Sequence, residues 1–585
     1  MMRFLKWFLF SCSLLLAAGC SIFGIHFQVH NPHRAGSYRH DDTKAVHLLG
    51  ALTKYRMCFD VTHNFLKINV DPQKRYLKGS NTMTAKVVVD FDTLQVDLFK
   101  NLKMNSIVFE GKNLSWKRIE GAYFVAMPRM MKAGESFSLV MSYEGKPVTA
   151  RKAPWDGGFV WKKDKNDQPW IGVACETEGA SLWWPCKDHN SDEADSMDMS
   201  ITVPKGLVCV CNGTFRDSLN PGGDGDNAIT HTTFNWHISY PINNYDVTLY
   251  IGKLKLLHDT YQSTVTGQTL DLNYYVLGYN YDKAREHFKQ VKQILDFYEH
   301  QYGAYPWYKD GYKLVESPYE GMEHQTAIAY GYGYKNSYGE DFDYIILHET
   351  AHEWWGNGIT AADLADVWIQ EGMATYAEAL YVEKYYGRDR AIQYLGTYRI
   401  SIINRRPMVG PAGRRWFWYK DGDVYVKGAW MMHTLRTVIN DDKLFFDILK
   451  SFRETYNCKT VSSQDFIDWV NKKTGADYTW FFDQYLRNRF TPVLEYYMTY
   501  NRLYYRWVDV KPSFSMSIYF TMNGEDEEHI LSPTTEVMEL KAGDFFKTLS
   551  LSEDRQLFGV KENSKLEKMY EKLHPNEHSE DPEPK

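Results

Sequence analysis

The sequence predicts a multidomain α+β protein. Its 585 residues amount to about three or four domains of roughly 150 residues each. Hydrophobic residues make up 44% of the chain and charged residues 24%, a globular composition that excludes disorder of the whole chain. Strand-like alternation dominates residues 45–255, helical periodicity dominates 256–490, and strand-like alternation returns in 491–570. We therefore expect a β domain, a mostly helical domain and a second β domain, in that order.

The first β domain is predicted from short runs in which apolar and polar residues alternate. Such runs occupy residues 84–91, 137–143 and 197–203, and Gly, Pro, Asn and Asp separate them. A period of two places every second side chain on the same face, which suits a strand with one buried face.

The middle domain is predicted from helical spacing of apolar residues. An amphipathic helix is expected over residues 284–302, because Gly303 and Pro306 would stop it there. Further helices are expected over residues 342–356, 372–386, 424–439 and 463–472.

The last β domain is predicted from three runs separated by polar turns, at residues 494–500, 504–510 and 516–522. The remaining residues, 571–585, are rich in Pro and acidic residues and are predicted to form a disordered tail.

The charge of the chain argues against one class of partner. Lys and Arg together number 67 and Asp and Glu 74, so the formal net charge is −7. A nucleic-acid binder needs clustered positive charge to contact phosphates. We expect no nucleic-acid partner.

Residues 1–20 are predicted to be a signal peptide. Arg3 and Lys6 give a positive start, an apolar run follows over residues 7–18, and small residues lead to Cys20. This ending resembles a bacterial lipobox, in which Cys20 becomes the lipidated first residue of the mature protein. We expect an exported bacterial protein that is lipid-anchored through Cys20 to a cell-envelope membrane, facing the periplasm or at the cell surface. A plain cleaved signal peptide is the alternative.

The strongest chemical signal is the run from His348 to His352 with Glu349 inside it. On a helix, residues four apart project from the same face, so the imidazoles of His348 and His352 can bind one metal ion. Glu349 lies beside them and can act as the general base on a water molecule. The alternative is a helix with two buried histidines that hydrogen-bond to carboxylates.

A third metal ligand is predicted in the next helical segment. A catalytic zinc ion takes three protein ligands and keeps one position open for water. Glu371 opens this segment at a distance along the chain that permits a turn back, so it can complete a set of two histidines and one glutamate. Glu378 lies seven residues further on the same helical face, where it either supports a ligand histidine or is a solvated helix charge.

Together these segments resemble the aminopeptidase N-like gluzincins, peptidase family M1. That family has a His-Glu-x-x-His motif followed after eighteen residues by a glutamate, the spacing found from His348 to Glu371. Residues 320–324 resemble the family's Gly-x-Met-Glu-Asn exopeptidase motif, and residues 425–429 resemble the segment that bears its catalytic tyrosine. Further similar segments lie at residues 175–176, 184–188 and 201–206.

The resemblance implies the architecture of the short, three-domain form of the family. Residues 45–255 would form a saddle-like N-terminal β-sheet domain, residues 256–490 a thermolysin-like zinc catalytic domain, and residues 491–570 a C-terminal β-sandwich. The large C-terminal helical domain of longer family members is not expected.

The resemblance also implies site roles beyond the metal ligands. Tyr425 would donate a hydrogen bond to the oxyanion of the reaction. Glu323 and Glu176 would hold the α-amine of the substrate, a compact cation that suits carboxylates. Gly321 and Met322 would bind substrate within the same motif as Glu323.

The strand at residues 312–316, which leads into that motif, is expected to present an open edge to the substrate backbone. Two residues depart from the family pattern, because Glu320 stands where Gly is usual and His324 where Asn is usual. The first substrate pocket is therefore expected to differ, and strict exopeptidase behaviour stays open.

The predicted function is a zinc metalloaminopeptidase with one Zn²⁺ per chain that removes N-terminal amino acids from peptides. The nearest alternative is a zinc endopeptidase or dipeptidyl-type peptidase with relaxed amine recognition. An alternative from another class is a non-catalytic surface binding protein on a peptidase scaffold. The sequence leaves open the oligomeric state and the side chain preferred at the substrate N-terminus.

Overall fold

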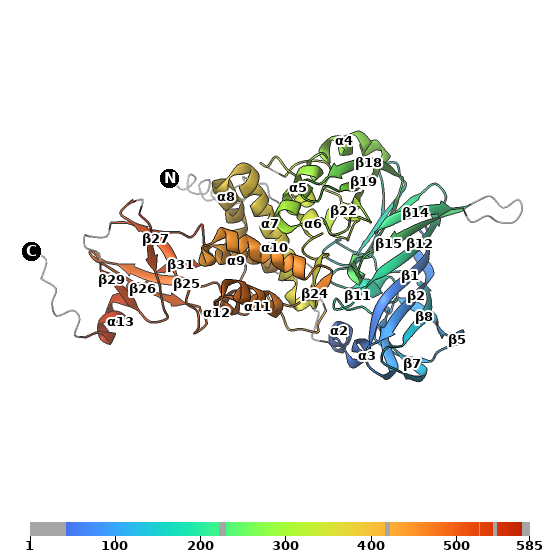
Figure 1. Cartoon of the computed structure of the whole chain (residues 1–585), viewed down its shortest axis with the longest axis horizontal. Helices are drawn as coiled ribbons and strands as arrows, with labels where there is room; N and C mark the ends of the chain where they lie inside the picture. The colour runs from blue at the N-terminus through green and yellow to red at the C-terminus, as the bar shows by residue number, and fades with distance from the viewer. Residues whose placement is uncertain are drawn as a thin grey trace, which may run out of the picture.

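The computed structural model describes residues 43–220, 230–337, 339–415, 422–525, 527–541 and 547–575. The predicted signal peptide and the lipidation site at Cys20 lie outside the described residues. A β-rich N-terminal part, a mostly helical middle part and a smaller β-rich C-terminal part follow one another (Figure 1). This order confirms the predicted α+β fold class.

The N-terminal part is built on an eight-stranded sheet with the spatial order β14-β15-β12-β1-β2-β8-β4-β5. Its strands are β1 Phe59–Asp71, β2 Tyr76–Val87, β4 Leu102–Phe109, β5 Lys112–Asn113, β8 Ser136–Gly145, β12 Ser196–Pro204, β14 Thr214–Leu219 and β15 His231–Ile238. The predicted strands at 137–143 and 197–203 lie within β8 and β12. The run 84–91 is instead divided between β2 and β3, because residues 88–90 bend away between the two strands.

Smaller sheets and two short helices complete this part. Helices α2 Lys44–Gly50 and α3 Lys54–Met57 precede the large sheet. The smaller sheets are β3 Phe91–Asp97 with β7 Ala122–Met131 and β6 Trp116–Ile119; β13 Val208–Cys211 with β17 Leu249–Gly252, β10 Pro169–Ala174 and β9 Gly158–Lys163; and β11 Glu193–Ala194 with β16 Ile242–Asn243. The 3-10 helices are η1 Ala180–Leu182 and η2 Asn244–Asp246.

The middle part combines a five-stranded sheet with a group of helices. The sheet has the order β18-β19-β20-β22-β21, with β18 Leu254–Gln262, β19 Thr269–Leu277, β20 Tyr312–Glu316, β22 Ile328–Tyr330 and β21 Gly321–Met322. The helices are α4 Tyr281–His287, α5 Gln290–Tyr302, α6 Tyr344–Ala351, α7 Trp368–Tyr386, α8 Arg388–Arg399, α9 Asp423–Ile439, α10 Asp442–Thr455, α11 Ser463–Thr474 and α12 Thr479–Tyr485. The pair β23 Ile359–Ala361 and β24 Lys459–Val461 and the 3-10 helices η3 Gly278–Asn280 and η4 Leu364–Asp366 complete this part.

The expectation that residues 312–316 form an open edge is wrong. Strand β20 pairs in parallel with β19 on one side and with β22 on the other, so its backbone groups are used inside the sheet. The strand at the edge is β21, Gly321–Met322, which pairs only with β22 among the described strands. Any added substrate strand would therefore meet β21 and not β20.

Two predicted helices differ in extent from the observed ones. The helix expected over 284–302 is divided into α4 and α5, and Phe288 between them packs against Tyr274 and Tyr330. The helix expected over 342–356 is shorter, because α6 ends at Ala351 and a series of turns follows.

The C-terminal part contains two sheets. One has four strands in the order β29-β26-β25-β31, and the other has three in the order β28-β27-β30. Their bounds are β25 Val493–Met498, β26 Arg502–Val508, β27 Ile518–Met522, β28 His529–Leu531, β29 Met538–Lys541, β30 Leu549–Leu551 and β31 Gly559–Glu562. Apolar side chains of both sheets, among them Trp507 and Phe520, belong to one buried core.

The predicted tail begins later than residue 571. Helix α13, Leu566–Leu573, buries Leu566 and Tyr570, and Tyr570 packs on Tyr504 of β26. This apolar contact keeps residues 571–573 helical, and the tail from residue 576 onward lies outside the described residues.

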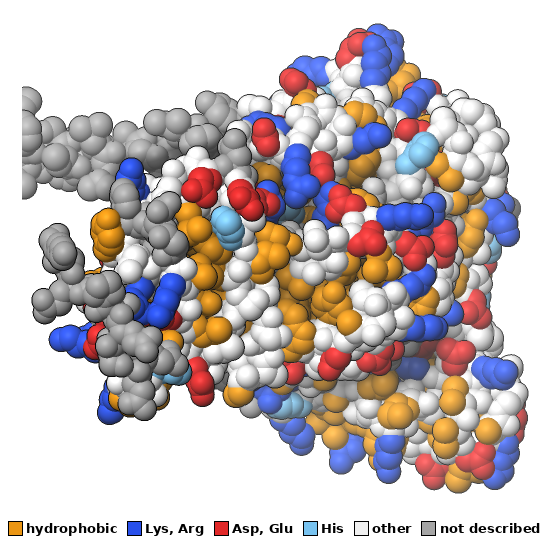
Figure 2. All heavy atoms as spheres, turned by 60° about the vertical axis from the view of Figure 1, so that its left-hand side comes forward, with side chains coloured by type: hydrophobic (Ala, Val, Ile, Leu, Met, Phe, Trp, Pro, Cys, Tyr) orange, Lys and Arg blue, Asp and Glu red, His pale blue; other side chains and the backbone are white. Residues whose placement is uncertain are grey.

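Two large cores support the fold. One fills the N-terminal part and extends to Met322 and Ala329 of the middle sheet, and the other joins the helices to the C-terminal strands. Hydrophobic side chains also gather in the middle of the face drawn in Figure 2, with charged side chains around them. Among the described helices, none combines the length and the apolar character that a membrane span needs.

Candidate active site

Helix α6 brings the two motif histidines together. Asp343 caps its N-terminus by accepting a hydrogen bond from the backbone N–H of Ile345 at 3.0 Å. The helix ends at Ala351, but His352 in the following turn keeps α-helical backbone angles. His348 and His352 therefore project from the same face, and their Nε2 atoms lie 3.1 Å apart.

Helix α7 supplies the carboxylate predicted as the third ligand. Glu371 lies in the first turn of α7 and is 2% exposed. Its Oε2 atom is 3.4 Å from the Nε2 atom of His348 and 3.4 Å from the Nε2 atom of His352. The three donor atoms thus form a nearly equilateral triangle.

This triangle has the size that a zinc ion requires. Nitrogen and oxygen ligands at about 2.0 to 2.2 Å from a tetrahedral ion stand about 3.3 Å from one another. The observed separations of 3.1 to 3.4 Å match that spacing. The three side chains also form one of the described His, Cys, Asp and Glu groups that could hold a metal ion.

The hydrogen bonds at the far side of each imidazole fix its tautomer. The Nδ1 atom of His352 lies 2.8 Å from the carbonyl oxygen of Trp355, and that of His348 lies 2.6 Å from Oε1 of Glu378. Since both partners accept hydrogen bonds, each Nδ1 carries a proton, and each Nε2 is the atom that faces Glu371. Two Nε2 atoms and a carboxylate oxygen that face one another suit a shared cation, either a proton on the imidazoles or a metal ion that replaces it.

Glu378 is therefore buried support for His348 and not a solvated helix charge. It is 1% exposed, and its Oε2 atom accepts hydrogen bonds from the hydroxyls of Tyr394 and Tyr398, each at 2.5 Å. These two tyrosines come from helix α8. Such partners hold a metal-ligating imidazole in one orientation.

The ionisation of the three predicted ligands reflects their mutual attraction. Burial disfavours the charged form of His348, but hydrogen bonds to Glu371 and Glu378 outweigh it and raise its pKa well above the usual range. Burial likewise disfavours the Glu371 carboxylate, and the positive charge of the histidines outweighs it and lowers its pKa. The site thus favours a carboxylate beside positive charge.

Glu349 lies against the backbone of β21. It is 7% exposed, and burial raises its pKa to about 8 despite the opposing effect of His348. A Cβ atom built on Gly321 would lie 2.4 Å from Oε1 of Glu349, so a larger residue there would displace this carboxylate. Gly321 therefore allows the carboxylate of Glu349, the predicted base, to lie where it does.

Glu176 and Glu323 meet next to the predicted ligands. Glu176 comes from a turn of the N-terminal part and Glu323 follows β21, and one carboxylate oxygen from each lies within 4.8 Å of the other and of Glu371. Glu323 also receives a hydrogen bond from the hydroxyl of Tyr245 at 3.4 Å. Two carboxylates from different parts of the fold thus face one small volume that suits a cation.

Tyr425 lies close to Glu371 because helices α7 and α9 approach at two glycines. A Cβ atom built on Gly428 would lie 2.8 Å from the Cα atom of Gly372, and one built on Gly372 would lie 3.0 Å from the Cα atom of Gly428. Tyr425 lies in the first turn of α9, three residues before Gly428. Its hydroxyl donates a hydrogen bond to Oε1 of Glu371 at 2.8 Å. The structure therefore brings Tyr425 to the triangle.

The other motif residues point elsewhere. Met322 is 3% exposed and belongs to the N-terminal core, so its side chain packs inside the protein. His324 is fully buried and shares a hydrogen bond of 2.8 Å with the hydroxyl of Tyr250. Glu320 is exposed and accepts a hydrogen bond from Tyr344.

Several residues near the site were not predicted. Tyr394 and Tyr398 support Glu378, Tyr245 contacts Glu323, and Trp155, 55% exposed, packs edge to face against the ring of Tyr425. The sequence could have indicated Tyr394 and Tyr398, because two tyrosines four residues apart on a helix project from one face. No pattern in the neighbouring residues indicates Tyr245 or Trp155.

Residues 286–408 match the model of the peptidase family M1 domain. Among curated proteins, human aminopeptidase RNPEPL1 is 24% identical over 376 residues, which cover 59% of this chain and 46% of that protein. Leukotriene A-4 hydrolase from Xenopus laevis is 20% identical over 425 residues, which cover 70% of this chain and 67% of that protein. The chain thus spans about half the length of the human relative.

Solved structures show the same fold. Crystal structures of mutant forms of an M1 zinc metallopeptidase from Deinococcus radiodurans, one of them bound to a Tyr-Ser-Ala substrate, match with a TM-score of 0.61 at 22% identity. The match covers 74% of this chain and 95% of that protein. These findings confirm the predicted resemblance to the aminopeptidase N-like M1 family.

Proposed function

We propose, from the match of residues 286–408 to the peptidase family M1 domain, that this chain is a zinc metalloaminopeptidase that removes N-terminal amino acids from peptides. The observation that carries the proposal is the triangle of His348, His352 and Glu371, with Glu349, Glu323 and Glu176 beside it. A metal centre and an amine site that lie next to each other suit cleavage of the first peptide bond.

One zinc ion per chain would be held by Nε2 of His348, Nε2 of His352 and a carboxylate oxygen of Glu371. Bound there, zinc supplies a Lewis acid that polarises the scissile carbonyl and lowers the pKa of water to about 7. Glu378 and the carbonyl of Trp355 keep both imidazoles in the tautomer that leaves Nε2 available.

Glu349 would be the general base. Its carboxylate takes the proton from the attacking water and passes it to the nitrogen of the leaving amine. Gly321 supports this role, since the absence of a side chain there lets the carboxylate lie against β21.

Glu176 and Glu323 would bind the free α-ammonium of the substrate. Three carboxylates within 4.8 Å of one another are a stable arrangement when a cation lies between them, and the ammonium is such a cation. The first peptide bond would then lie close to the predicted metal ligands, because the amine site shares Glu371 with them.

Tyr425 would stabilise the transition state. Its hydroxyl, which donates to Glu371 at 2.8 Å, can turn its proton to the carbonyl oxygen that gains negative charge. Removing one such donor costs about 2.7 to 4 kcal/mol of transition-state stabilisation in comparable sites.

The test compares aminoacyl amides and short peptides with their N-acetylated forms. We expect hydrolysis of the free-amine forms, release of single amino acids, loss of activity with a zinc chelator and recovery with added Zn²⁺. Cleavage of the N-acetylated peptides would favour an endopeptidase, and release of dipeptides would favour a dipeptidyl-type peptidase. If the purified protein contains no metal and hydrolyses none of these substrates, the remaining alternative is a non-catalytic binding protein.

We also propose that the chain is a bacterial lipoprotein that is exported and anchored through Cys20. The support is the order of charged, apolar and small residues before Cys20. Wild-type protein should incorporate labelled palmitate and sediment with membranes, and Cys20→Ser should do neither. A membrane-bound, labelled Cys20→Ser protein would contradict this proposal.

A further inference from the structure

Among the described residues of the middle part, Arg415 holds the turn that carries Glu176. Residues 175–179 form this turn, which is closed by a hydrogen bond of 2.7 Å from the N–H of Gly179 to the carbonyl of Cys175. Arg415, which precedes helix α9, reaches across to it. We infer that Arg415 is a positioning residue that holds Glu176 opposite Glu323, where the substrate amine binds. This inference rests on the proposed function.

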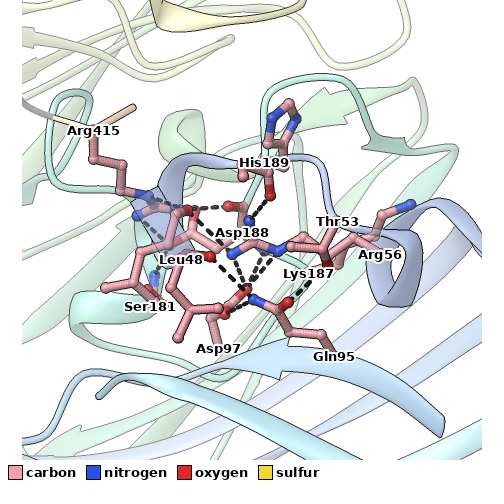
Figure 3. Close-up of polar contacts among 12 residues, drawn as sticks. Leu48, Thr53, Arg56, Gln95, Asp97, Ser181, Lys187, Asp188, His189 and Arg415 are labelled. Atoms are coloured by element: carbon pink, nitrogen blue, oxygen red, sulfur yellow. Dashed lines mark hydrogen bonds and ion pairs between the residues drawn. The ribbon is translucent and has the colours of Figure 1, made fainter. Parts of the chain in front are cut away.

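The guanidinium of Arg415 makes four hydrogen bonds to the N-terminal part (Figure 3). Its Nε donates to the carbonyl of Leu49 at 2.9 Å, and its Nη1 donates to Oδ2 of Asp188 at 2.7 Å. Nη1 also donates to the carbonyl of Glu178, and Nη2 donates to the carbonyl of Asp188. One buried side chain thus binds helix α2, the turn and the segment after η1.

The turn is shaped to receive this guanidinium. Gly179 has a φ of +88°, and a Cβ atom built there would overlap Nη1 of Arg415. Any other residue at 179 would push the arginine out of its place. The Oδ2 atom of Asp188 also accepts a hydrogen bond from the N–H of Ser181 at 2.9 Å, which ties the other end of the turn to the same carboxylate.

A second buried ion pair fixes Asp188 from the opposite side. Oδ2 of Asp97 accepts from Nη2 of Arg56 at 2.6 Å and from the N–H of Asp188 at 3.2 Å. All four charged side chains are at most 5% exposed. Two guanidinium groups and two carboxylates balance, so this network is stable without any ligand.

The turn needs such a restraint because of what Glu176 faces. Its carboxylate, that of Glu323 and that of Glu371 each place one oxygen within 4.8 Å of the others, and like charges at this distance repel. Repulsion among these carboxylates favours an outward movement of the turn. The bond from Arg415 to the carbonyl of Glu178, two residues beyond Glu176, opposes that movement.

The test measures kcat and KM on an aminoacyl amide for Arg415→Lys, Glu176→Gln and the double variant, with metal content and Tm. Lysine keeps the charge but cannot make the four directed bonds. We expect KM to rise about tenfold or more in Arg415→Lys, as for loss of a charge-assisted hydrogen bond, with metal content unchanged. The double variant should have the KM of Glu176→Gln alone, because a turn without its carboxylate has nothing to position.

Arg56→Lys is the matched control. It removes the other buried arginine of the network, which does not bond to the turn, so it should lower Tm by a similar amount and leave KM unchanged. Equal KM values in Arg415→Lys and Arg56→Lys, or additive effects in the double variant, would overturn the inference.

Asp188→Asn provides a second route if Arg415→Lys does not fold. It keeps the backbone carbonyl and one side-chain acceptor, and we expect a smaller rise in KM in the same direction; an unchanged KM would contradict the inference. If the wild-type protein has no activity on aminoacyl amides, the proposed function is wrong. Failure of the proposed function is thus distinguished from failure of the inference about Arg415.

Discussion

The chain contains two buried clusters of charge that differ in balance. Around the predicted metal ligands, five carboxylates surround two imidazoles: Glu176, Glu323, Glu349, Glu371 and Glu378. In the network of Arg415, Asp188, Asp97 and Arg56, two cations meet two anions. Among these residues, carboxylates outnumber imidazoles in the first cluster, whereas guanidinium groups and carboxylates are equal in number in the second.

The difference separates a binding site from a structural connection. Burying charge costs several kcal/mol per ion, so a cluster rich in carboxylates favours the binding of a cation among them. Zinc and a substrate ammonium would supply that charge at the first cluster. The balanced cluster is complete by itself and can hold one part of the fold against another.

The largest effect should come from the base. Glu349→Gln removes the proton acceptor but keeps the shape of the side chain, so kcat should fall by about 10²- to 10⁴-fold while zinc content and KM change little. Metal analysis and steady-state kinetics measure this. The exposed control Glu286→Gln should keep full activity. Full activity in Glu349→Gln would exclude the proposed mechanism.

Tyr425→Phe should have the next largest effect. It removes the hydroxyl that lies 2.8 Å from Glu371 and leaves the ring packing against Trp155 in place. We expect kcat to fall by about 10²- to 10³-fold with little change in KM. Tyr386→Phe, at the exposed end of α7, serves as the control. A loss confined to KM would show that Tyr425 binds substrate and does not stabilise the transition state.

Glu378→Gln tests the support of the metal site and not its ligands. The change weakens the hydrogen bond to Nδ1 of His348, so zinc affinity should fall by about 10- to 100-fold in a competition titration with a chelator. Glu383→Gln lies on the same helix, pairs with Arg436 and should leave zinc affinity unchanged. Equal zinc affinities of Glu378→Gln and wild type would assign Glu378 to packing alone.

The smallest effect concerns a buried carboxylate outside both clusters. Burial raises the pKa of Glu193 to about 7 from an ordinary value of 4.5. The folded protein therefore binds more protons than the unfolded chain between these pH values, and stability falls as pH rises through this window. Glu193→Gln lacks this dependence.

We expect Glu193→Gln to match wild type in stability near pH 4.5 and to exceed it by about 1 to 3 kcal/mol at pH 8. Urea unfolding at both pH values measures the difference. The exposed control Glu571→Gln should differ from wild type by less than about 0.5 kcal/mol at either pH. A stability gain that is the same at both pH values would refute the titration argument.

Local patterns predicted much of the fold. The helix expected over 424–439 is α9, Asp423–Ile439, and the helix expected over 463–472 lies within α11, because an amphipathic stripe is encoded within the helix itself. The approach of His348 and His352 follows from their spacing alone. The support that Glu378 gives to His348 was one of two alternatives, and only its burial decides between them.

Contacts between distant segments could not be predicted. The position of β20 inside the sheet depends on pairing with β19 and β22, which no pattern within residues 312–316 encodes. The bonds of Arg415 reach residues more than two hundred positions away, and a lone arginine carries no signal for them. Met322 lies in a recognisable motif, yet its side chain packs in the N-terminal core, which depends on how that core is filled.

The glycine contact between α7 and α9 has a consequence for how this protein can vary. Main chain touches main chain at Gly372 and Gly428, with no side chain between them to be enlarged or trimmed. The spacing between the ligand carboxylate and the phenol is therefore built into the backbone and is insensitive to changes elsewhere. A larger residue at either glycine would push the two helices apart, and with them Glu371 and Tyr425.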